Sequence, residues 1–435
     1  MGLHADTIFA LSSGRGRAGV AVVRVSGPAA AATLRKLAGP EVPLPRVAAL
    51  RKISDLNGHT IDDGLVLWFP APASFTGEDV AEFHIHGGRA VLEALFAAIS
   101  GISGLRPAEA GEFTRRAVEN GKFDLTQAEA LADLINAETE AQRRQALRQY
   151  EGALHDLYEG WRTALIRAAA WVEAAIDFSD EEIPAGAMAE AKAQVAEILV
   201  EMRSHLTDAR RGEILREGFR LTVIGPPNSG KSSLVNALAR REVAIVSEIA
   251  GTTRDVLEVH LDLGGYAVIV ADTAGLRETA DQIEAEGVRR ALARTESADA
   301  VLLLLDAAAP DAPLPELPQV AALTAWNKVD LAPPPVGALA VSVETGAGMN
   351  FLLQQIGNIV RDRLGSCGAP ALTRERHRHA LSRAATALQQ SLVAEEPEIV
   401  AEELRLAMRD LGRVTGAVDV EELLDVVFRD FCIGK

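Results

Sequence analysis

The stretch LTVIGPPNSGKSSLVNALAR, Leu221 to Arg240, decides the fold of the central part of this chain. It begins with an apolar run typical of a buried strand, passes through a glycine-rich turn and ends in a segment with the composition of a helix. The turn matches the pattern Gly, four residues and Gly-Lys-Ser, in which backbone N–H groups surround phosphate oxygens at a helix N-terminus. The segment therefore predicts a phosphate-binding loop from Gly225 to Ser233, between a strand and a helix.

Three further apolar runs follow this loop and predict strands: residues 266–275, 300–306 and 322–330. Helical segments separate some of these runs, which favours an α/β domain with a mostly parallel sheet. The connection between Asp306 and Asn327 differs, because a proline inside a helix costs on the order of 3 kcal/mol. We expect this connection to be largely irregular, or to hold at most a very short helix, since it carries Pro310, Pro313, Pro315 and Pro318.

The sequence on either side of this domain has a different character. β-Branched and apolar runs near the N-terminus predict strands at residues 19–30, 65–72 and 80–88. Segments rich in Ala, Leu, Glu, Gln and Arg predict helices at residues 127–178, 188–215 and 373–431. We therefore expect a multidomain α/β plus all-α chain, in which the α/β domain (215–370) is inserted into a helical domain (121–214 and 371–435) that follows an α+β domain (1–120).

Composition excludes several classes of protein. The chain has 435 residues, 48% hydrophobic and 24% charged, which is typical of a folded globular protein. Its apolar runs are too short to span a bilayer, and Cys367 and Cys432 are its only cysteines, so a reducing cytoplasm without membrane contact is expected. The net charge of −17 gives the chain a negative overall electrostatic field, which repels the phosphates of RNA. Any RNA contact must therefore be local or made by a partner.

Four further motifs follow the phosphate-binding loop in the order of a GTP-binding domain: GTTRD (251–255), DTAG (272–275), NKVD (327–330) and SVETG (342–346). Asp330 can accept two hydrogen bonds from guanine, and adenine lacks that pair of donors. Lys231 would contact the β- and γ-phosphates, while Ser232 and Thr253 would bind Mg²⁺. The residues predicted to bind GTP are Asn228, Ser229, Gly230, Lys231, Ser232, Ser233, Ser247, Thr252, Thr253, Asp272, Thr273, Ala274, Gly275, Asn327, Lys328, Asp330 and Ser342.

Leu276 follows DTAG at the place where many GTPases carry the glutamine that orients the attacking water. The side-chain oxygen of Asn228 could instead hold a monovalent cation beside the phosphates, with backbone carbonyls from residues 244–253. An acidic side chain of the following loop could position the water: Glu278, Asp281, Glu284 or Glu286. For most of these acids, an ordinary solvated charged loop is the better explanation.

The motifs FTGEDVAEFHIHGG, GKFDLTQAEALADLI, GPPNSGKSSLVN, IAGTTRD, DTAGLRE and the terminal FCIGK together resemble the MnmE (TrmE) family of tRNA-modification GTPases. This resemblance covers essentially the whole chain. It implies an N-terminal domain similar to folate-binding aminomethyltransferase domains, a helical domain and an inserted G domain. It also implies a homodimer that joins an FAD-dependent MnmG-type flavoprotein in a heterotetramer, and K⁺-dependent pairing of G domains that stimulates hydrolysis.

The reaction that the resemblance implies is addition of an aminomethyl or carboxymethylaminomethyl group to carbon 5 of the wobble uridine of certain tRNAs. The one-carbon unit would come from 5-formyl- or 5,10-methylene-tetrahydrofolate, and FAD would enter only through the partner. A ribosome-assembly GTPase, which switches on RNA without group transfer, is the alternative. Such proteins carry a basic RNA-binding module after the G domain, whereas this chain ends in an acidic helical segment and FCIGK.

Site residues follow from the resemblance by position. The K⁺ ligands would be Asn228, Ser247, Ile249 and Thr252, and the Mg²⁺ ligands would be Ser232 and Thr253. Glu284 would orient the water and act with Lys231 in catalysis, while folate would be bound by Arg24, Glu82, Lys122 and Lys435. Cys432 is either a residue of one-carbon transfer or a small buried side chain. Glu82, His84 and His86 share one face of a predicted strand. Because the sequence offers no clear fourth ligand on that face, we do not expect a metal site there.

Overall fold

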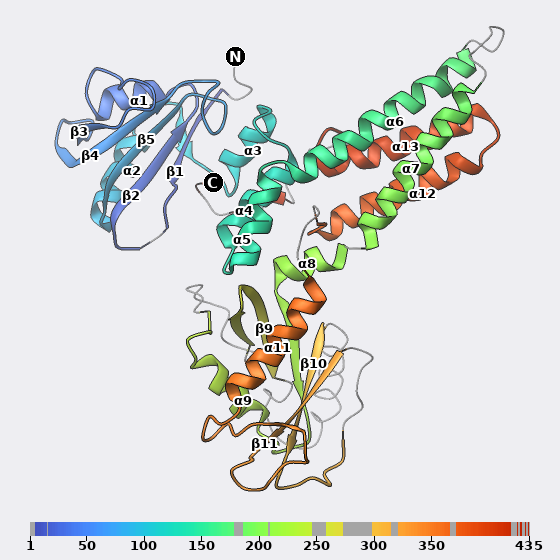
Figure 1. Cartoon of the computed structure of the whole chain (residues 1–435). Coiled ribbons are helices and arrows are strands. Elements are labelled where there is room, and N and C mark those ends of the chain that lie inside the picture. The colour runs from blue at the N-terminus through green and yellow to red at the C-terminus, as the bar shows by residue number, and fades with distance from the viewer. Residues whose placement is uncertain are drawn as a thin grey trace, which may run out of the picture. The chain divides into compact units, whose positions relative to one another are not determined.

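The computed structural model describes residues 5–14, 16–177, 186–207, 209–245, 258–272, 298–314, 321–365 and 371–418, with Leu424, Val427, Phe428, Phe431 and Gly434. The chain, drawn in Figure 1 with its helices and strands labelled, divides into two compact units. The first unit is Met1–Ala132 with Arg409–Lys435, and the second is Asp133–Met408. The three domain boundaries expected from the sequence, after residues 120, 214 and 370, remain predictions.

A six-stranded sheet forms the centre of the first unit, in the order β3-β4-β5-β2-β1-β6. Neighbouring strands are antiparallel except β1 and β6, which are parallel. Helices α1 (Ala30–Leu37) and α2 (Arg89–Ser100) cover one face of the sheet (Figure 1). The strands are β1 (Thr7–Leu11), β2 (Ala18–Ser26), β3 (Ala49–Ser54), β4 (Thr60–Phe69), β5 (Val80–Gly87) and β6 (Leu105–Pro107).

Alternation along β2 and β5 explains how this sheet is packed. Val23, Val25 and Phe83 are fully buried in the core beneath the helices. Arg24 and Glu82, one residue away from these positions, are paired across the two strands and lie on the opposite face. Near β1 that second face is partly covered by α3 (Glu112–Glu119). The predicted strands are therefore confirmed, and so is the common face of the polar residues.

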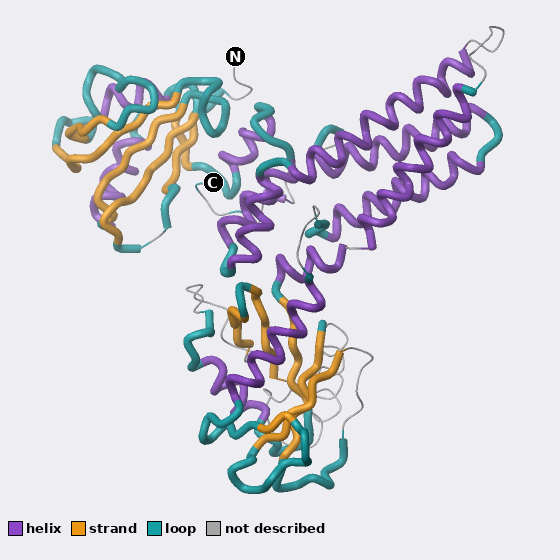
Figure 2. The backbone as a smooth tube through the Cα atoms, in the orientation of Figure 1, coloured by secondary structure: helices purple, strands orange, loops and turns teal. Residues whose placement is uncertain are grey.

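Long helices make up much of the rest of the chain (Figure 2). The stretch predicted as helical from residue 127 to 178 contains three helices, and Gly152, with φ +101°, separates the second from the third. Helices α6, α7 and α12 pack against one another, with Tyr158 and Trp161 in their interior. The helices are α4 (Leu125–Asn136), α5 (Glu140–Tyr150), α6 (Ala153–Asp177), α7 (Ala187–Thr207), α8 (Ala209–Glu217), α12 (Glu375–Val393) and α13 (Pro397–Thr415).

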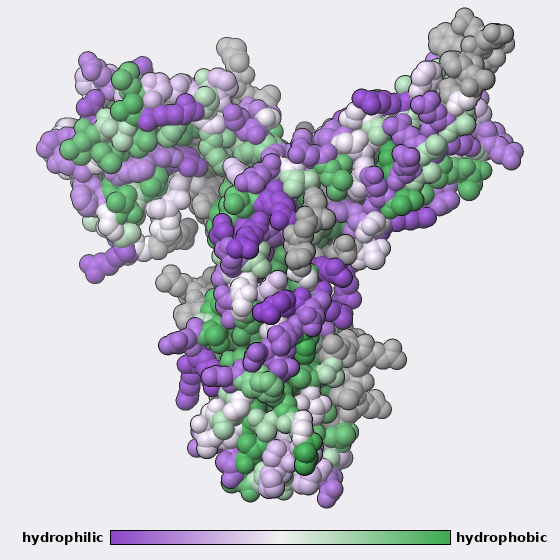
Figure 3. All heavy atoms as spheres, in the orientation of Figure 1, coloured by the Kyte–Doolittle hydropathy of each residue, from purple (hydrophilic) through white to green (hydrophobic). Residues whose placement is uncertain are grey.

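Polar and apolar residues are interspersed on the face of the molecule seen in Figure 3. Among the residues that the structure describes, no helix combines the length and apolar character that crossing a membrane would require.

A second six-stranded sheet lies in the second unit, in the order β12-β11-β10-β7-β9-β8. Among the strand pairs in the described residues, only β8 and β9 are antiparallel, so the predicted mostly parallel sheet is confirmed. Helices α9 (Lys231–Ala239) and α11 (Met349–Leu364) share one hydrophobic core with it. The strands are β7 (Phe219–Ile224), β8 (Glu258–Leu263), β9 (Tyr266–Asp272), β10 (Ala300–Asp306), β11 (Ala321–Asn327) and β12 (Leu339–Ala340).

The proline-rich connection after β10 is irregular where it is described. Residues 307–314 form turns and no helix or strand, and residues 315–320 lie outside the described range. Because β7, β10 and β11 are parallel, their carboxyl ends meet at one edge of the sheet. That edge carries the phosphate-binding loop after β7 and the NKVD motif at the end of β11.

Candidate functional site

Two glycines of the phosphate-binding loop occupy positions that no other residue fits. Gly225 has φ +156°, and a Cβ atom there would lie 2.1 Å from the carbonyl oxygen of Leu304. Gly230 has φ +97°, and its Cβ would lie 2.3 Å from Nδ2 of Asn327. The loop therefore approaches β10 and β11 at van der Waals distance, which only glycine permits.

The loop directs donors toward its own interior. Lys231 Nζ donates to the carbonyl oxygens of Gly225 and Pro226, each at 3.0 Å. Ser229 is fully buried, and its Oγ has no hydrogen-bond partner among the described residues. Since α9 begins at Lys231, its positive N-terminal end faces the same loop. A buried donor, an ammonium group and a helix N-terminus together fit an anionic phosphate chain. Asn228 is exposed at the tip of the loop with φ +63°, and Ser232 and Ser233 lie in the first turn of α9.

Asn327 ties the phosphate-binding loop to the segment that follows β12. Its side chain is buried, and Nδ2 donates to the carbonyl oxygen of Ser229 at 2.9 Å. Its Oδ1 accepts a hydrogen bond from the backbone N–H of Val343 at 3.1 Å. Val343 belongs to the SVETG motif, so Asn327 joins that motif to the phosphate-binding loop.

The other NKVD residues also lie at this edge of the sheet. Lys328, with φ +62°, places its Nζ 2.6 Å from Oδ2 of Asp306. Asp330 is exposed beyond it, and Ser342 is fully buried with its Oγ accepting from the N–H of Thr345 at 3.2 Å. Sequence reasoning missed Asp306, although its place as the last residue of an apolar strand next to β11 is a usable signal.

Part of the predicted nucleotide site lies outside the described residues. Asp272 ends β9, but its side chain is not described. Other predicted site residues lie entirely outside the described ranges: Ser247, Ile249, Thr252, Thr253, Thr273, Ala274, Gly275 and Glu284. Their roles with Mg²⁺, K⁺ and the attacking water therefore remain predictions.

A second polar site lies in the first unit, where Arg24 and Glu82 meet across β2 and β5. Arg24 Nε and Nη2 lie 3.0 and 2.9 Å from Oε1 of Glu82, and Nε2 of His84 lies 3.2 Å from Oε2. Burial acts to raise the pKa of Glu82, but the hydrogen bond with His84 and the charge of Arg24 outweigh it and hold that pKa below its usual value. The carboxylate therefore stays ionised and accepts hydrogen bonds.

Two aromatic rings pack against the Arg24 guanidinium. Its Cζ lies 5.1 Å from the ring centroid of Phe75 and 5.8 Å from that of Phe113. Phe75 belongs to the loop of residues 70–79, and Phe113 belongs to α3. Sequence reasoning did not single out either ring, because their approach to Arg24 depends on tertiary packing.

Lys122 contacts the loop that carries Phe75. Its Nζ donates to the carbonyl oxygen of Pro72 at 3.0 Å, and its Cδ would lie 3.3 Å from a Cβ on Gly77. Lys435 and Cys432 lie outside the described residues, but the carbonyl oxygen of Gly434 accepts from Oγ of Ser12 at 2.9 Å. The structure thus brings Arg24 and Glu82 together, places Lys122 on the adjoining loop and brings Gly434 to the end of β1.

Histidines near this site are engaged in pairs. Nδ1 of His86 lies 2.8 Å from Oδ1 of Asp62, while His84 contacts Glu82. Within the described part of the chain, no group of three His, Cys, Asp or Glu side chains is arranged to hold a metal ion.

Known proteins match the chain along its whole length. Residues 7–122 match the family model of the GTP-binding protein TrmE N-terminus, and residues 125–432 match that of the MnmE helical domain. The tRNA modification GTPase MnmE of Rhodospirillum rubrum is 54% identical over 452 residues, covering 99% of each chain. This chain belongs to the MnmE family of tRNA modification GTPases. The MnmE protein of Paramagnetospirillum magneticum is also 54% identical, over 99% of this chain and all of its own.

Membership of the MnmE family confirms the resemblance and the expected fold class. The chain is a GTPase that hydrolyses GTP in tRNA modification, and a GTPase of this kind uses its nucleotide with Mg²⁺. The alternative of a ribosome-assembly GTPase is thereby not supported. Among solved structures, the G domain of the T. maritima FeoB iron transporter aligns with 32% of this chain and 97% of its own at 22% identity, but its TM-score of 0.23 is too low to compare the folds.

Proposed function

We propose that this MnmE-family chain is a K⁺-dependent GTPase whose cycle drives modification of the wobble uridine in certain tRNAs. As a homodimer, it joins an FAD-dependent MnmG-type flavoprotein in a heterotetramer in the cytoplasm. Together they install an aminomethyl or carboxymethylaminomethyl group at carbon 5 of the uridine. The observation that carries this proposal is the presence of two built sites in one chain, the phosphate-binding loop and the Arg24–Glu82 pair.

At the first site, this chain's own residues bind and orient GTP. Lys231 contacts the β- and γ-phosphates, Ser232 and Thr253 hold the Mg²⁺, and Asp330 accepts the two hydrogen bonds of guanine. The orphaned Oγ of Ser229 and the two obligatory glycines support phosphate binding in this loop. Mg²⁺, when bound, neutralises charge that develops on the phosphates.

Glu284 and the K⁺ ligands complete the proposed hydrolytic machinery. Asn228 is exposed at the tip of the phosphate-binding loop, which supports its role as a cation ligand with Ser247, Ile249 and Thr252. K⁺ supplies positive charge beside the phosphates when bound. Glu284 orients the attacking water, a role that a glutamine at the position of Leu276 has in many GTPases. Hydrolysis is stimulated when the G domains of two chains pair.

The cation requirement is tested by measuring GTP hydrolysis in KCl and NaCl at equal ionic strength. We expect faster hydrolysis in KCl, and we expect Asn228→Ala to abolish the difference. The control is Asn350→Ala, because Asn350 is an exposed asparagine of the same domain at the start of α11. Equal rates of the native chain in the two salts would exclude the K⁺ mechanism.

At the second site, we propose that Arg24, Glu82, Lys122 and Lys435 bind 5-formyl- or 5,10-methylene-tetrahydrofolate. Arginine and lysine pair with the carboxylates of folate, while the ionised Glu82 accepts hydrogen bonds from donors of the pterin. FAD is held by the partner and not by this chain. Whether Cys432 takes part in one-carbon transfer or is a small packed side chain is left open by these residues.

Folate binding is tested by titration calorimetry with 5-formyltetrahydrofolate. We expect binding by the native chain and loss of binding in Arg24→Ala. The matched control is Arg35→Ala, because Arg35 is an exposed arginine on α1 of the same unit. Failure of the native chain to bind at high micromolar concentration would count decisively against the one-carbon site.

A further inference from the structure

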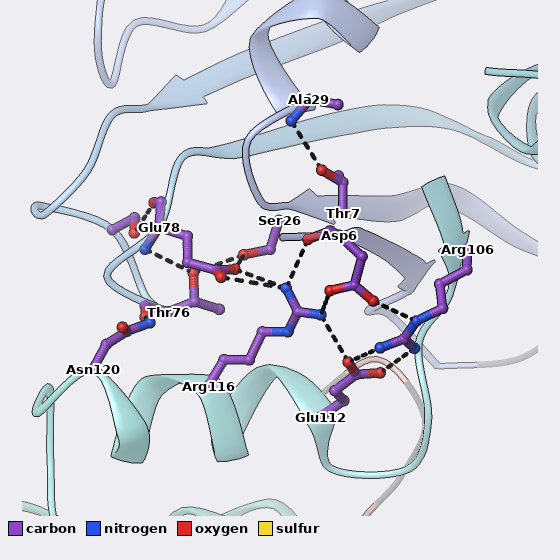
Figure 4. A network of polar contacts seen from close by, with 11 residues as sticks. Asp6, Thr7, Ser26, Ala29, Thr76, Glu78, Arg106, Glu112, Arg116 and Asn120 are labelled. Carbon is purple, nitrogen blue, oxygen red and sulfur yellow. Dashed lines mark hydrogen bonds and ion pairs between the residues drawn. The ribbon is translucent and has the colours of Figure 1, made fainter. Parts of the chain in front are cut away.

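A fully buried arginine, Arg116, joins three parts of the first unit (Figure 4). Its Nη2 lies 2.9 Å from Oδ1 of Asp6, before β1, and 2.9 Å from Oε1 of Glu112, in the first turn of α3. Its Nη1 lies 3.3 Å from Oε1 of Glu78, in the loop of residues 70–79, and donates to the carbonyl oxygen of Asp6 at 3.1 Å. One guanidinium group therefore holds the start of β1, the loop and the helix together.

The network continues from Glu78 to the end of β2. Ser26 Oγ donates to Oε2 of Glu78 at 2.7 Å and shares a 2.7 Å hydrogen bond with the hydroxyl of Thr76. From the other side, Nδ2 of Asn120 donates to the carbonyl oxygen of Thr76 at 2.8 Å. Figure 4 shows these side chains converging on the loop from β2 and from the end of α3.

Arg106 supports the same carboxylates from β6. Its Nε lies 2.6 Å from Oδ2 of Asp6 and its Nη2 lies 2.6 Å from Oε1 of Glu112. Burial acts to raise the pKa of Asp6 and of Glu112, but the hydrogen bonds and charges of Arg106 and Arg116 outweigh it and leave both pKa values lowered. Asp6 and Glu112 therefore remain ionised at neutral pH.

Both aromatic rings that pack on Arg24 are carried by elements that Arg116 holds. Phe75 lies in the loop fixed through Glu78, and Phe113 lies in α3, next to Glu112. Ser26 follows Arg24 by two residues on β2, so the network also meets the strand that carries Arg24. Among the described residues, the side chains of the Arg116 network make no hydrogen bond or ion pair with Arg24. The network therefore meets the Arg24 guanidinium through the rings of Phe75 and Phe113.

We propose that Arg116 is a positioning residue for the Arg24 site, because it fixes the separation of the Phe75 and Phe113 rings and with it the direction of the Arg24 guanidinium. The inference rests on the proposed binding of folate at Arg24. Buried ion networks often contribute little net stability compared with apolar packing, so the role assigned to this network is to specify one arrangement of the elements it joins. The planar guanidinium of Arg116 contacts three carboxyl groups at once. A lysine ammonium group lacks the planar set of donors that this arrangement requires.

Arg116→Lys tests this role, because it keeps the charge but removes the fork. We expect the Kd for 5-formyltetrahydrofolate to rise about tenfold, while GTP hydrolysis changes less than about twofold. The matched control is Arg115→Lys, because Arg115 is the preceding residue of α3 and pairs along the helix with Glu119 at 3.0 Å. The control should bind folate like the native chain.

A double-mutant cycle with Phe75→Leu separates positioning from loss of stability. If Arg116 acts through the ring, the effects of Arg116→Lys and Phe75→Leu on folate affinity are not additive, and the double variant binds about as weakly as the weaker single variant. If the fold-changes in Kd of the two single variants multiply in the double variant, their free energies are additive. Arg116 would then act only on stability, and the inference would be overturned. Ser26→Ala replaces Arg116→Lys in the cycle if the lysine variant does not fold, since it weakens the same hold on Glu78.

The native chain separates this inference from the proposed function. If the native chain does not bind 5-formyltetrahydrofolate, the proposed one-carbon site is wrong and the inference falls with it. If the native chain binds and Arg116→Lys binds equally well, only the inference is wrong.

Discussion

Replacement of Asn327 by alanine should loosen the nucleotide site without touching a nucleotide-binding side chain on the loop itself. The change removes the donor to the Ser229 carbonyl oxygen and the acceptor of the Val343 N–H, at 2.9 and 3.1 Å. Because Asn327 is buried, no water readily replaces it, and each orphaned group costs about 1–3 kcal/mol. The interaction between the phosphate-binding loop and the SVETG segment would then be weakened by roughly 2–6 kcal/mol.

The assay is equilibrium binding of a fluorescent GDP derivative to the full chain. If about half of this free energy is lost from nucleotide binding, the Kd rises between about fivefold and about 150-fold. Asn350→Ala is the matched control, because its side chain is exposed on α11 and should leave the Kd unchanged. A Kd of the Asn327→Ala variant within about twofold of the native value would refute the assigned role of Asn327.

Three further predictions concern the two sites. Gly225→Ala should abolish nucleotide binding, because its Cβ would lie 2.1 Å from the Leu304 carbonyl oxygen, and folate titration of the same variant should be unchanged. Asp330→Asn should weaken GTP binding and favour xanthosine triphosphate, since an amide donor matches the carbonyl that xanthine carries in place of the guanine amine; unchanged preference in competition binding would contradict this. Because the folded-state pKa values of Asp6 and Glu112 are lowered, their stabilisation of the first unit is complete above about pH 5 and is lost as pH falls through those values. Hydrogen-exchange protection of α3 should therefore be constant above about pH 5 and should drop progressively as the pH is lowered further, and protection that stays constant until the whole chain unfolds in acid would exclude this linkage.

Local sequence was enough to predict the features that depend on short stretches of chain. The phosphate-binding loop needs only a strand, two glycines and a helix start within Leu221–Arg240, so its pattern identified it. Alternation in β5 likewise placed Glu82 on the polar face of the sheet. The helices predicted from residue 127 to 178 were confirmed, but the break at Gly152 was not predicted, because it depends on a left-handed backbone position.

Contacts between distant segments could not be predicted in the same way. Arg116 meets Asp6 across 110 residues, and Ser12 meets Gly434 across 422 residues, so neither contact follows from any local pattern. From sequence alone, Arg116 looks like one of two neighbouring arginines on a polar helix, and only the packing of α3 shows which one is buried. The same reason hid Phe75 and Phe113, whose relation to Arg24 depends on the tertiary arrangement of three elements.

The most direct test of the account uses tRNA from a bacterial strain that lacks its own MnmE-family protein and is supplied with this chain. Mass spectrometry of the nucleosides measures how much wobble uridine carries the modification. We predict that the native chain restores the modified uridine and that neither Lys231→Ala nor Arg24→Ala restores it, since both sites are required. Full restoration by Arg24→Ala, at a protein level equal to that of the native chain, would contradict the account.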